Sequence, residues 1–269
     1  MHNASFKLFL HSGLPVGCAT PNVVAVQEML DYPGIFGTGF FARRNQQAYY
    51  FTALHCATAS RDNCEPEFQA LMVPYRLEGR TSGAQDFIQV NSAITILQCI
   101  DDVFDYRLDL VAYPILEPPR ARDRQHLLSR CAKLPPTGDW LERFLTTDVA
   151  KNALASGETL LAQCVGYPEC VSGTNIKYGI GGVGMEISTQ LVVASGKVVW
   201  SSIEHCLRLE GVTWHDDLSG FSGAPVFARL PSEHGPQFAL IGMIICGSSN
   251  HVSFIRVGTL VKALGAVNV

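Results

Sequence analysis

The sequence lacks the features that mark membrane, repeat and nucleic-acid-binding proteins. None of its apolar runs approaches the ~20 residues that a membrane-spanning helix needs. No unit recurs along the chain with the period of a repeat protein. Basic residues are not in excess, since 20 lysines and arginines stand against 24 acidic residues, for a net charge of −4. We therefore expect neither a membrane nor a nucleic acid as a partner.

The nine cysteines lack the patterns of a metal site or a disulfide framework. Their number is odd, no C-x-x-C occurs, and no cysteines or histidines have structural-zinc spacing. The apolar stretch at 7–10 is too short for the core of a signal peptide. We therefore expect a cytoplasmic protein with free thiols, and neither a metal nor another cofactor.

What the sequence does contain is a globular composition and many short β-rich runs. Hydrophobic residues make up 47% of the 269 residues and charged residues 16%, enough for a substantial core. The runs recur about every ten residues with turn residues between them, which predicts a barrel or sandwich. In the first half they lie at 23–26, 37–42, 48–53, 69–75, 87–90, 93–99 and 108–115. In the second half they lie at 160–165, 190–193, 197–200, 206–209, 225–229, 238–246 and 251–257.

The pattern changes between these two halves. Apolar residues at 140, 141, 144 and 145 share one face of a helix, so we expect a partly helical connector over 119–158. The predicted organisation is an N-terminal β domain at 1–118 and a C-terminal one at 159–269, joined by this connector. The glycine-rich segment 179–184 is interpreted as a loop, because it lacks the strand-to-helix context of a phosphate-binding loop.

One segment, GFSGAP at 220–225, combines a hydroxyl with an unusual backbone. Its glycines permit conformations closed to other residues and allow another molecule to approach the main chain. Pro225 fixes its own φ and restricts Ala224, which stiffens the loop after the serine. A stiff loop with exposed N–H groups beside a hydroxyl is what an oxyanion hole needs. A tight turn with a surface serine is the alternative at this point.

A catalytic serine needs a base within hydrogen-bond distance, and the base needs a third group to orient it. His55 follows the apolar run 49–54, where we expect a strand to end. Asp109 lies inside the apolar run 107–113, where a buried carboxylate requires a donor such as an imidazole. Taken singly, the two could equally be a satisfied core histidine and a capping acid.

Taken together, these motifs resemble the trypsin/chymotrypsin-like serine peptidases. The segment TALHC at 52–56 is similar to T-A-x-H-C of that family, DLVA at 109–112 to its D-[IL]-A, and 220–225 to its G-x-S-G-x-P. GTGF at 37–40 and VGYP at 165–168 resemble stretches of bacterial members. The order His, Asp, Ser is that of chymotrypsin, not of subtilisin or the α/β-hydrolases. The resemblance implies two six-stranded antiparallel barrels, a site between them, and peptide hydrolysis through an acyl-enzyme.

The same resemblance implies a role for each residue of the triad. Ser222 is expected to be the nucleophile, His55 the general base and then the acid, and Asp109 the group that holds the imidazole tautomer. The backbone N–H groups of Gly220 and Ser222 are expected to form the oxyanion hole.

Substrate recognition is also placed by the resemblance. An extended polypeptide would pair with the edge of strand 240–247 by β-augmentation, at Ile245, Cys246 and Gly247. Asp216, six residues before the serine, falls at the base of the pocket for the side chain preceding the cleaved bond. A carboxylate there favours Arg or Lys. The alternatives are that Asp217 points inward, or that His215 favours acidic side chains.

The chain departs from the family pattern at three places. No cysteine lies within 37–42 to pair with Cys56, and Leu218 replaces the cysteine found four residues before the serine. Both differences favour an intracellular enzyme. Phe221 stands where zymogen-type relatives have an aspartate that pairs with a freed N-terminal amine, so that activation switch is not expected. Because an unregulated peptidase would endanger a cytoplasm, we expect a regulatory protein partner or a narrow specificity.

Two other functions compete with a peptidase. A catalytically silent trypsin-like domain that binds peptides or proteins would keep the same fold and the same residues. An esterase on an α/β-hydrolase fold would need glycine where Ala224 stands, and an acid after Ser222, where only Glu233 is available. Labelling of the serine by a fluorophosphonate distinguishes an enzyme from a binding module.

Overall fold

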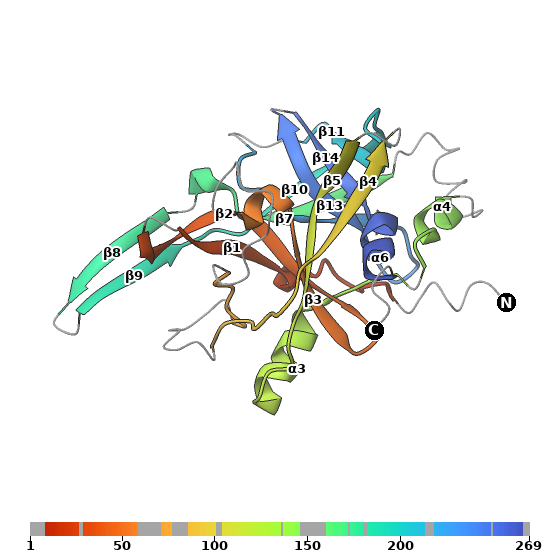
Figure 1. The fold of residues 1–269 in the computed structure, drawn as a ribbon. Helices are drawn as coiled ribbons and strands as arrows, with labels where there is room; N and C mark the ends of the chain where they lie inside the picture. The colour runs from red at the N-terminus through yellow and green to blue at the C-terminus, as the bar shows by residue number, and fades with distance from the viewer. Residues whose placement is uncertain are drawn as a thin grey trace.

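The computed structural model of the chain consists mostly of β-strands (Figure 1). It describes residues 9–26, 29–58, 71–76, 86–100, 104–135, 137–145, 160–171, 173–179, 182–212, 218–248 and 250–265. Among these residues no helix is both long and apolar enough to cross a membrane. The predicted β class is confirmed.

The N-terminal half forms a six-stranded sheet in the order β1-β2-β3-β5-β4, with β6 added beside β2. Its strands are β1 (Ala19–Val26), β2 (Met29–Arg44), β3 (Gln47–Thr52), β4 (Ile94–Ile100), β5 (Phe104–Pro114) and β6 (Ala132–Lys133). All neighbours are antiparallel except the short β2–β6 pair. In the part of the chain that the structure describes, this sheet does not close on itself. The prediction of two closed barrels is therefore confirmed only for the second half.

The C-terminal half forms a closed barrel in the order β10-β11-β14-β13-β12-β7. Its strands are β7 (Leu161–Gly166), β10 (Val192–Trp200), β11 (Cys206–Glu210), β12 (Pro225–Leu230), β13 (Gln237–Ser248) and β14 (His251–Arg256). Residues alternate between core and surface, as in the buried pair Ala194–Cys164 and the exposed pair Lys197–Leu161. This period of two is what the sequence pattern predicts for strands buried on one face.

A separate two-stranded ribbon extends from the body of the molecule (Figure 1). It consists of β8 (Gly173–Gly179) and β9 (Gly182–Ser188), which pair over their whole length from Gly173↔Ser188 to Gly179↔Gly182. The prediction of a loop at 179–184 is therefore wrong for the residues that end β8 and begin β9. The glycines at these ends lie in extended backbone that belongs to a hairpin.

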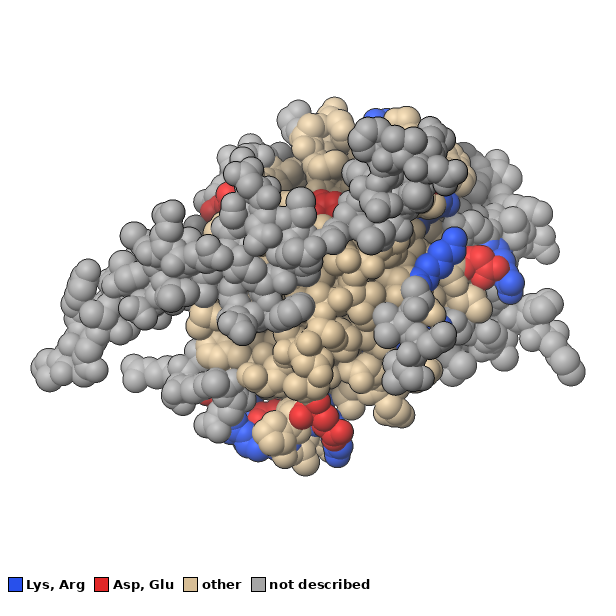
Figure 2. Space-filling view, viewed as in Figure 1, with Lys and Arg blue, Asp and Glu red and all other residues tan. Residues whose placement is uncertain are grey.

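Among the residues that the structure describes, the helices are few and short. They are α2 (Leu54–Ala57), α3 (Ala121–Arg130), α4 (Trp140–Leu145) and α6 (Val257–Gly265), with 3-10 turns at η2 (Val16–Cys18) and η4 (Glu169–Val171). Both α3 and α4 lie within the predicted helical connector, whereas α6 was not predicted. In Figure 2 the charges visible on the described surface lie mainly over α3 and near α4, and both signs are present.

Segments from both ends of the chain cross between the halves. His11 and Phe238 of β13 exchange two backbone hydrogen bonds of 2.9 Å, and the Phe9 ring lies 4.9 Å from the Trp140 ring. At the other end, α6 contacts β4 and β5 as well as β13. These contacts place the C-terminal helix against the N-terminal sheet.

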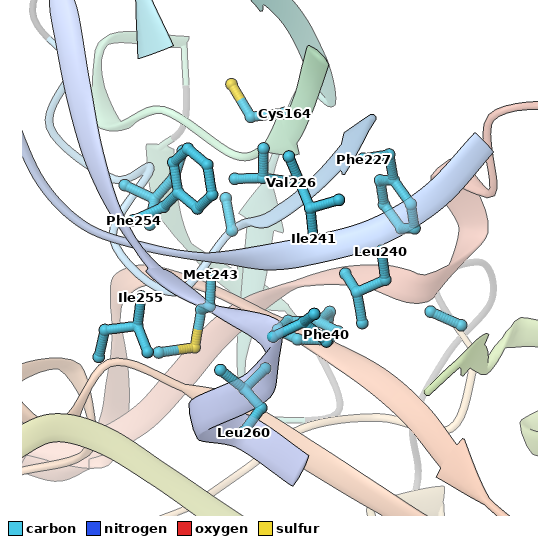
Figure 3. Packing of buried hydrophobic residues seen from close by; sticks show 14 of the residues in the cluster. Phe40, Cys164, Val226, Phe227, Leu240, Ile241, Met243, Phe254, Ile255 and Leu260 are labelled. Carbon is cyan, nitrogen blue, oxygen red and sulfur yellow. The ribbon is translucent and has the colours of Figure 1, made fainter. Parts of the chain in front are cut away.

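The hydrophobic core is shared by the two halves. Figure 3 shows Phe40 of β2 near Leu240 of β13 and Leu260 of α6, with side chains of the barrel above them in this view. Phe40 is completely buried, and burying such a side chain stabilises the fold by roughly 1.5–3 kcal/mol. Six cysteines whose side chains the structure describes are free thiols: Cys18, Cys56, Cys131, Cys164, Cys206 and Cys246.

Candidate active site

The loop before β12 has a backbone that only glycine accommodates. Gly220 and Gly223 have φ values of +91° and +86°, in the region that L-residues with side chains rarely adopt. A Cβ at Gly220 would lie 2.6 Å from the carbonyl oxygen of Tyr167, and one at Gly223 only 1.9 Å from that of Thr38. The two glycines that flank Phe221 and Ser222 are therefore required by both conformation and space.

Two backbone donors of the same loop have no partner in the described part of the chain. The N–H groups of Phe221, Gly223 and Ala224 donate to backbone carbonyl oxygens at 3.1, 2.7 and 2.8 Å. The N–H groups of Gly220 and Ser222 have no acceptor among the described residues. These two are the donors that the sequence predicts for an oxyanion hole, and preorganised donors of this kind stabilise developing negative charge.

His55 and Asp109 meet as the motifs predict. The Nδ1 atom of His55 lies 2.7 Å from Oδ2 of Asp109, and the backbone N–H of His55 donates to Oδ1 at 3.0 Å. An ionised carboxylate can only accept hydrogen bonds, so Nδ1 carries the proton of the neutral ring and Nε2 is left as an acceptor. This is the tautomer that a general base requires.

Two details of these residues differ from the prediction. Strand β3 ends at Thr52, so that His55 lies in the one-turn helix α2 rather than at the end of a strand. The Asp109 side chain is 27% exposed and that of His55 50%, so the carboxylate is less buried than its apolar surroundings in the sequence indicate. Its two hydrogen bonds to His55 explain why a partly exposed acid is found in this strand.

Gly37 lies between the serine loop and the histidine turn. A Cβ at Gly37 would lie 2.8 Å from both the Cys56 sulfur and the carbonyl oxygen of Ser222. The Cys56 thiol also points at that oxygen from 3.9 Å. Since Cys56 directly follows His55, the nucleophile and base segments are side by side. Burial raises the pKa of the Cys56 thiol far above its ordinary value, so it stays protonated and does not compete as a nucleophile.

The hydroxyl of Ser222 has a partner other than His55. Its Oγ donates to the carbonyl oxygen of Ile245 at 3.3 Å, and among the described residues it forms no hydrogen bond to His55. Ile245 is half-buried on β13, and the following residues, Cys246 and Gly247, are exposed. The predicted substrate-binding edge therefore begins at the residue that contacts the serine.

The other predicted specificity residues cannot be placed. Asp216, with its neighbours at 213–217, lies outside the described residues. Within the part of the chain that is described, no group of three or more His, Cys, Asp or Glu side chains is arranged to hold a metal ion.

Thr38 supports the serine loop in a way that the sequence motif did not indicate. Its buried Oγ1 donates to the carbonyl oxygen of Gly220 at 2.7 Å and accepts the N–H of Tyr167 at 2.9 Å. Its own N–H donates to the carbonyl oxygen of Ser222 at 2.8 Å. Thr38 lies in the GTGF segment at 37–40, whose sequence pattern alone predicts no such support.

Comparison with known proteins adds little to this site. No protein-family model matches the chain, and no curated protein matches it. A search of solved structures finds a chain from a study of coupled folding and binding of the Sesbania mosaic virus VPg protein. That chain is 13% identical, with a TM-score of 0.35 and 98% of each chain covered. Likeness at this level indicates neither a shared fold nor a shared activity.

Proposed function

We propose that this chain is a serine endopeptidase that hydrolyses peptide bonds with the triad Ser222, His55 and Asp109. The observation that carries the proposal is the paired contact of Asp109 with the ring and the backbone N–H of His55, at 2.7 and 3.0 Å. A carboxylate that forms hydrogen bonds with both the ring and the backbone N–H of one histidine fixes the tautomer and the orientation of the ring. A structural ion pair would not need the backbone contact or a neighbouring serine loop.

The proposed reaction uses the groups already described. Ser222 Oγ attacks the carbonyl carbon of the substrate while its proton passes to Nε2 of His55. The N–H groups of Gly220 and Ser222 bind the oxyanion of the tetrahedral intermediate. The C–N bond then breaks as His55 returns the proton to the leaving amine. Water, activated by the same histidine, cleaves the acyl ester and restores the serine.

One local rearrangement is needed before this reaction. Ser222 Oγ must leave the carbonyl oxygen of Ile245, 3.3 Å away, and turn towards His55. A bond of that length is weak, and rotation about the Cα–Cβ bond of Ser222 redirects its hydroxyl. Catalytic hydrogen bonds are often long in free enzymes and shorten only when substrate binds. The free carbonyl of Ile245 would then be available to an extended substrate.

The finer fold that we propose is chymotrypsin-like. In this interpretation the closed barrel carries Ser222 and the open N-terminal sheet is the counterpart of the first barrel. Asp109 on that sheet, His55 in the turn that follows β3, and the strap formed by 36–38 against the serine loop support the interpretation. The substrate would lie between the halves, along β13.

A second candidate function is a catalytically silent domain that binds peptides. The hydrogen bond of Ser222 to Ile245, rather than to His55, is the observation that favours it. In such a domain the edge of β13 would hold a partner peptide without cleaving it.

Reaction with a fluorophosphonate separates the two functions. An enzyme is labelled covalently at Ser222, and the label is absent from Ser222→Ala and strongly reduced in His55→Ala. The control Ser219→Ala, in the same loop, should be labelled like the wild type. No labelling of the folded wild-type protein, at any pH between 6 and 9, would favour the binding domain.

A further inference from the structure

We infer that Asn22 is a positioning residue for His55. It holds the turn that carries His55 in place relative to the loop that carries Ser222. The inference rests on the proposed function. Asn22 lies on β1, completely buried, and does not belong to any of the catalytic motifs.

The turn that carries His55 cannot hold its own shape. Helix α2 has only four residues, and its N-cap, Ala53, makes no side-chain capping bond. Its N-terminal backbone bond runs from Cys56 N–H to the carbonyl oxygen of Ala53 at 3.0 Å. Isolated single helical turns are unstable, because they fix several dihedral angles for very few hydrogen bonds. The orientation of His55 must therefore come from tertiary contacts.

Asn22 supplies such a tertiary contact. Its Nδ2 donates to the carbonyl oxygen of Cys56, the residue after His55, and also to that of Phe36 at 3.3 Å. Its Oδ1 accepts the hydroxyl of Tyr50 at 2.7 Å. Tyr50 is completely buried, and burial raises its pKa well above the ordinary value, so that it remains a donor. Both donors and the acceptor of the amide are thus engaged, which fixes its orientation.

The two carbonyl groups that Asn22 binds belong to opposite sides of the site. Cys56 continues the turn of the base. Phe36 begins the 36–38 strap, in which Thr38 N–H donates to the carbonyl oxygen of Ser222 at 2.8 Å. One buried amide therefore joins the segment of the base to the segment that supports the nucleophile. A change at Asn22 alters the relative position of the two without touching the substrate.

Three variants test this role. Asn22→Ala removes both donors and should lower kcat about 100-fold, the scale of effect for a misplacement of about 1 Å, with KM nearly unchanged. Asn22→Asp keeps the size of the side chain but presents oxygens to both carbonyl groups, so it should lose as much. Tyr50→Phe removes only the hydroxyl and leaves both amide donors in place, so its kcat should stay within tenfold of the wild type.

A stability control separates positioning from simple destabilisation. Leu209→Ala removes a completely buried side chain of β11 in the barrel, and should lower Tm without lowering kcat by more than a few fold. The two variants are compared when their Tm values are similar and both lie above the assay temperature. A loss of kcat in Asn22→Ala but not in Leu209→Ala is then explained only by a positioning role.

The measurements are kcat and KM for a peptide or activated ester, the rate of fluorophosphonate labelling, and Tm. Low kcat and slow labelling in both Asn22 variants, with the KM and fold of the wild type, support the inference. Wild-type labelling rates in a folded Asn22→Ala would overturn the inference and leave the proposed function standing. A loss expressed mainly in KM would also overturn it. A wild-type protein that neither reacts nor hydrolyses would overturn the proposed function and the inference together.

Discussion

Asp109→Asn replaces one oxygen by an NH2 group of similar size, in a side chain whose two contacts are known. The new amide oxygen can still accept the backbone N–H of His55, which is now 3.0 Å from Oδ1. The NH2 group then faces Nδ1, where the carboxylate oxygen lies 2.7 Å away, and donates to it. Nδ1 must become the acceptor, and the ring proton moves to Nε2. A protonated Nε2 cannot take the proton of Ser222.

The expected cost is large for so small a change. Holding the wrong tautomer lowers kcat by about 10⁴ in sites of this type, or about 5 kcal/mol of transition-state stabilisation. Both hydrogen-bonding positions stay occupied, so Tm should change little. The assay is hydrolysis of an activated ester, with fluorophosphonate labelling as a second readout.

Asp105→Asn is the matched control for this variant. Asp105 lies four residues earlier on β5, where it pairs in register with Cys99. Its variant should keep activity within tenfold of the wild type. If Asp105→Asn is inactive while Asp109→Asn works normally, the assignment of the acid is wrong.

Three further variants or treatments test other parts of the structure. Gly223→Ala should lower the free energy of unfolding by more than about 1–2 kcal/mol, because φ at this position is +86° and the added Cβ would lie 1.9 Å from a carbonyl oxygen. Thermal unfolding should show no such loss for Gly17→Ala, because the space around a Cβ at Gly17 is open. Burial, with Lys133 and Arg43 nearby, lowers the pKa of His11 to about 4, whereas the unfolded chain takes up this proton near 6.5. Stability from neutral His11 is therefore complete above about pH 6.5 and is lost towards pH 4, so Tm should fall more between pH 7 and 5 in the wild type than in His11→Gln. Thiol titration in denaturant should count nine free thiols, and a Cys164–Cys170 disulfide would contradict this. In the folded protein Cys164 should not react, because burial raises its pKa to about 12.

The predictions that are confirmed rest on local patterns. The glycines of 220–225 predict a special turn because glycine adopts positive φ at no steric cost, and Gly220 and Gly223 have φ values of +91° and +86°. Alternating apolar residues predict most strands of the barrel, since the period of two follows from backbone geometry. His55 and Asp109 are separated by 54 residues in the sequence, and only the combination of two motifs indicates their contact.

What the sequence does not indicate depends on distant partners. Thr38 binds Gly220 across 182 residues, and Asn22 binds Cys56 across 34, so no local pattern marks either polar side chain as buried. Helix α6 is missed because nearly all its residues are buried, which removes the polar face that reveals a surface helix. The ribbon β8–β9 is missed because glycines at the ends of its strands resemble a loop.

The crossing of the chain ends has a consequence for the order of events during synthesis. The sheet that carries Asp109 is made first, but part of its packing surface belongs to α6, which comes after every strand of the barrel. Residues near 11 likewise await β13 as their partner. A growing chain would therefore carry an incomplete N-terminal half until its last helix emerges. Because domains otherwise tend to fold as they leave the ribosome, this arrangement delays the packing of the two halves against each other until translation of α6 is complete.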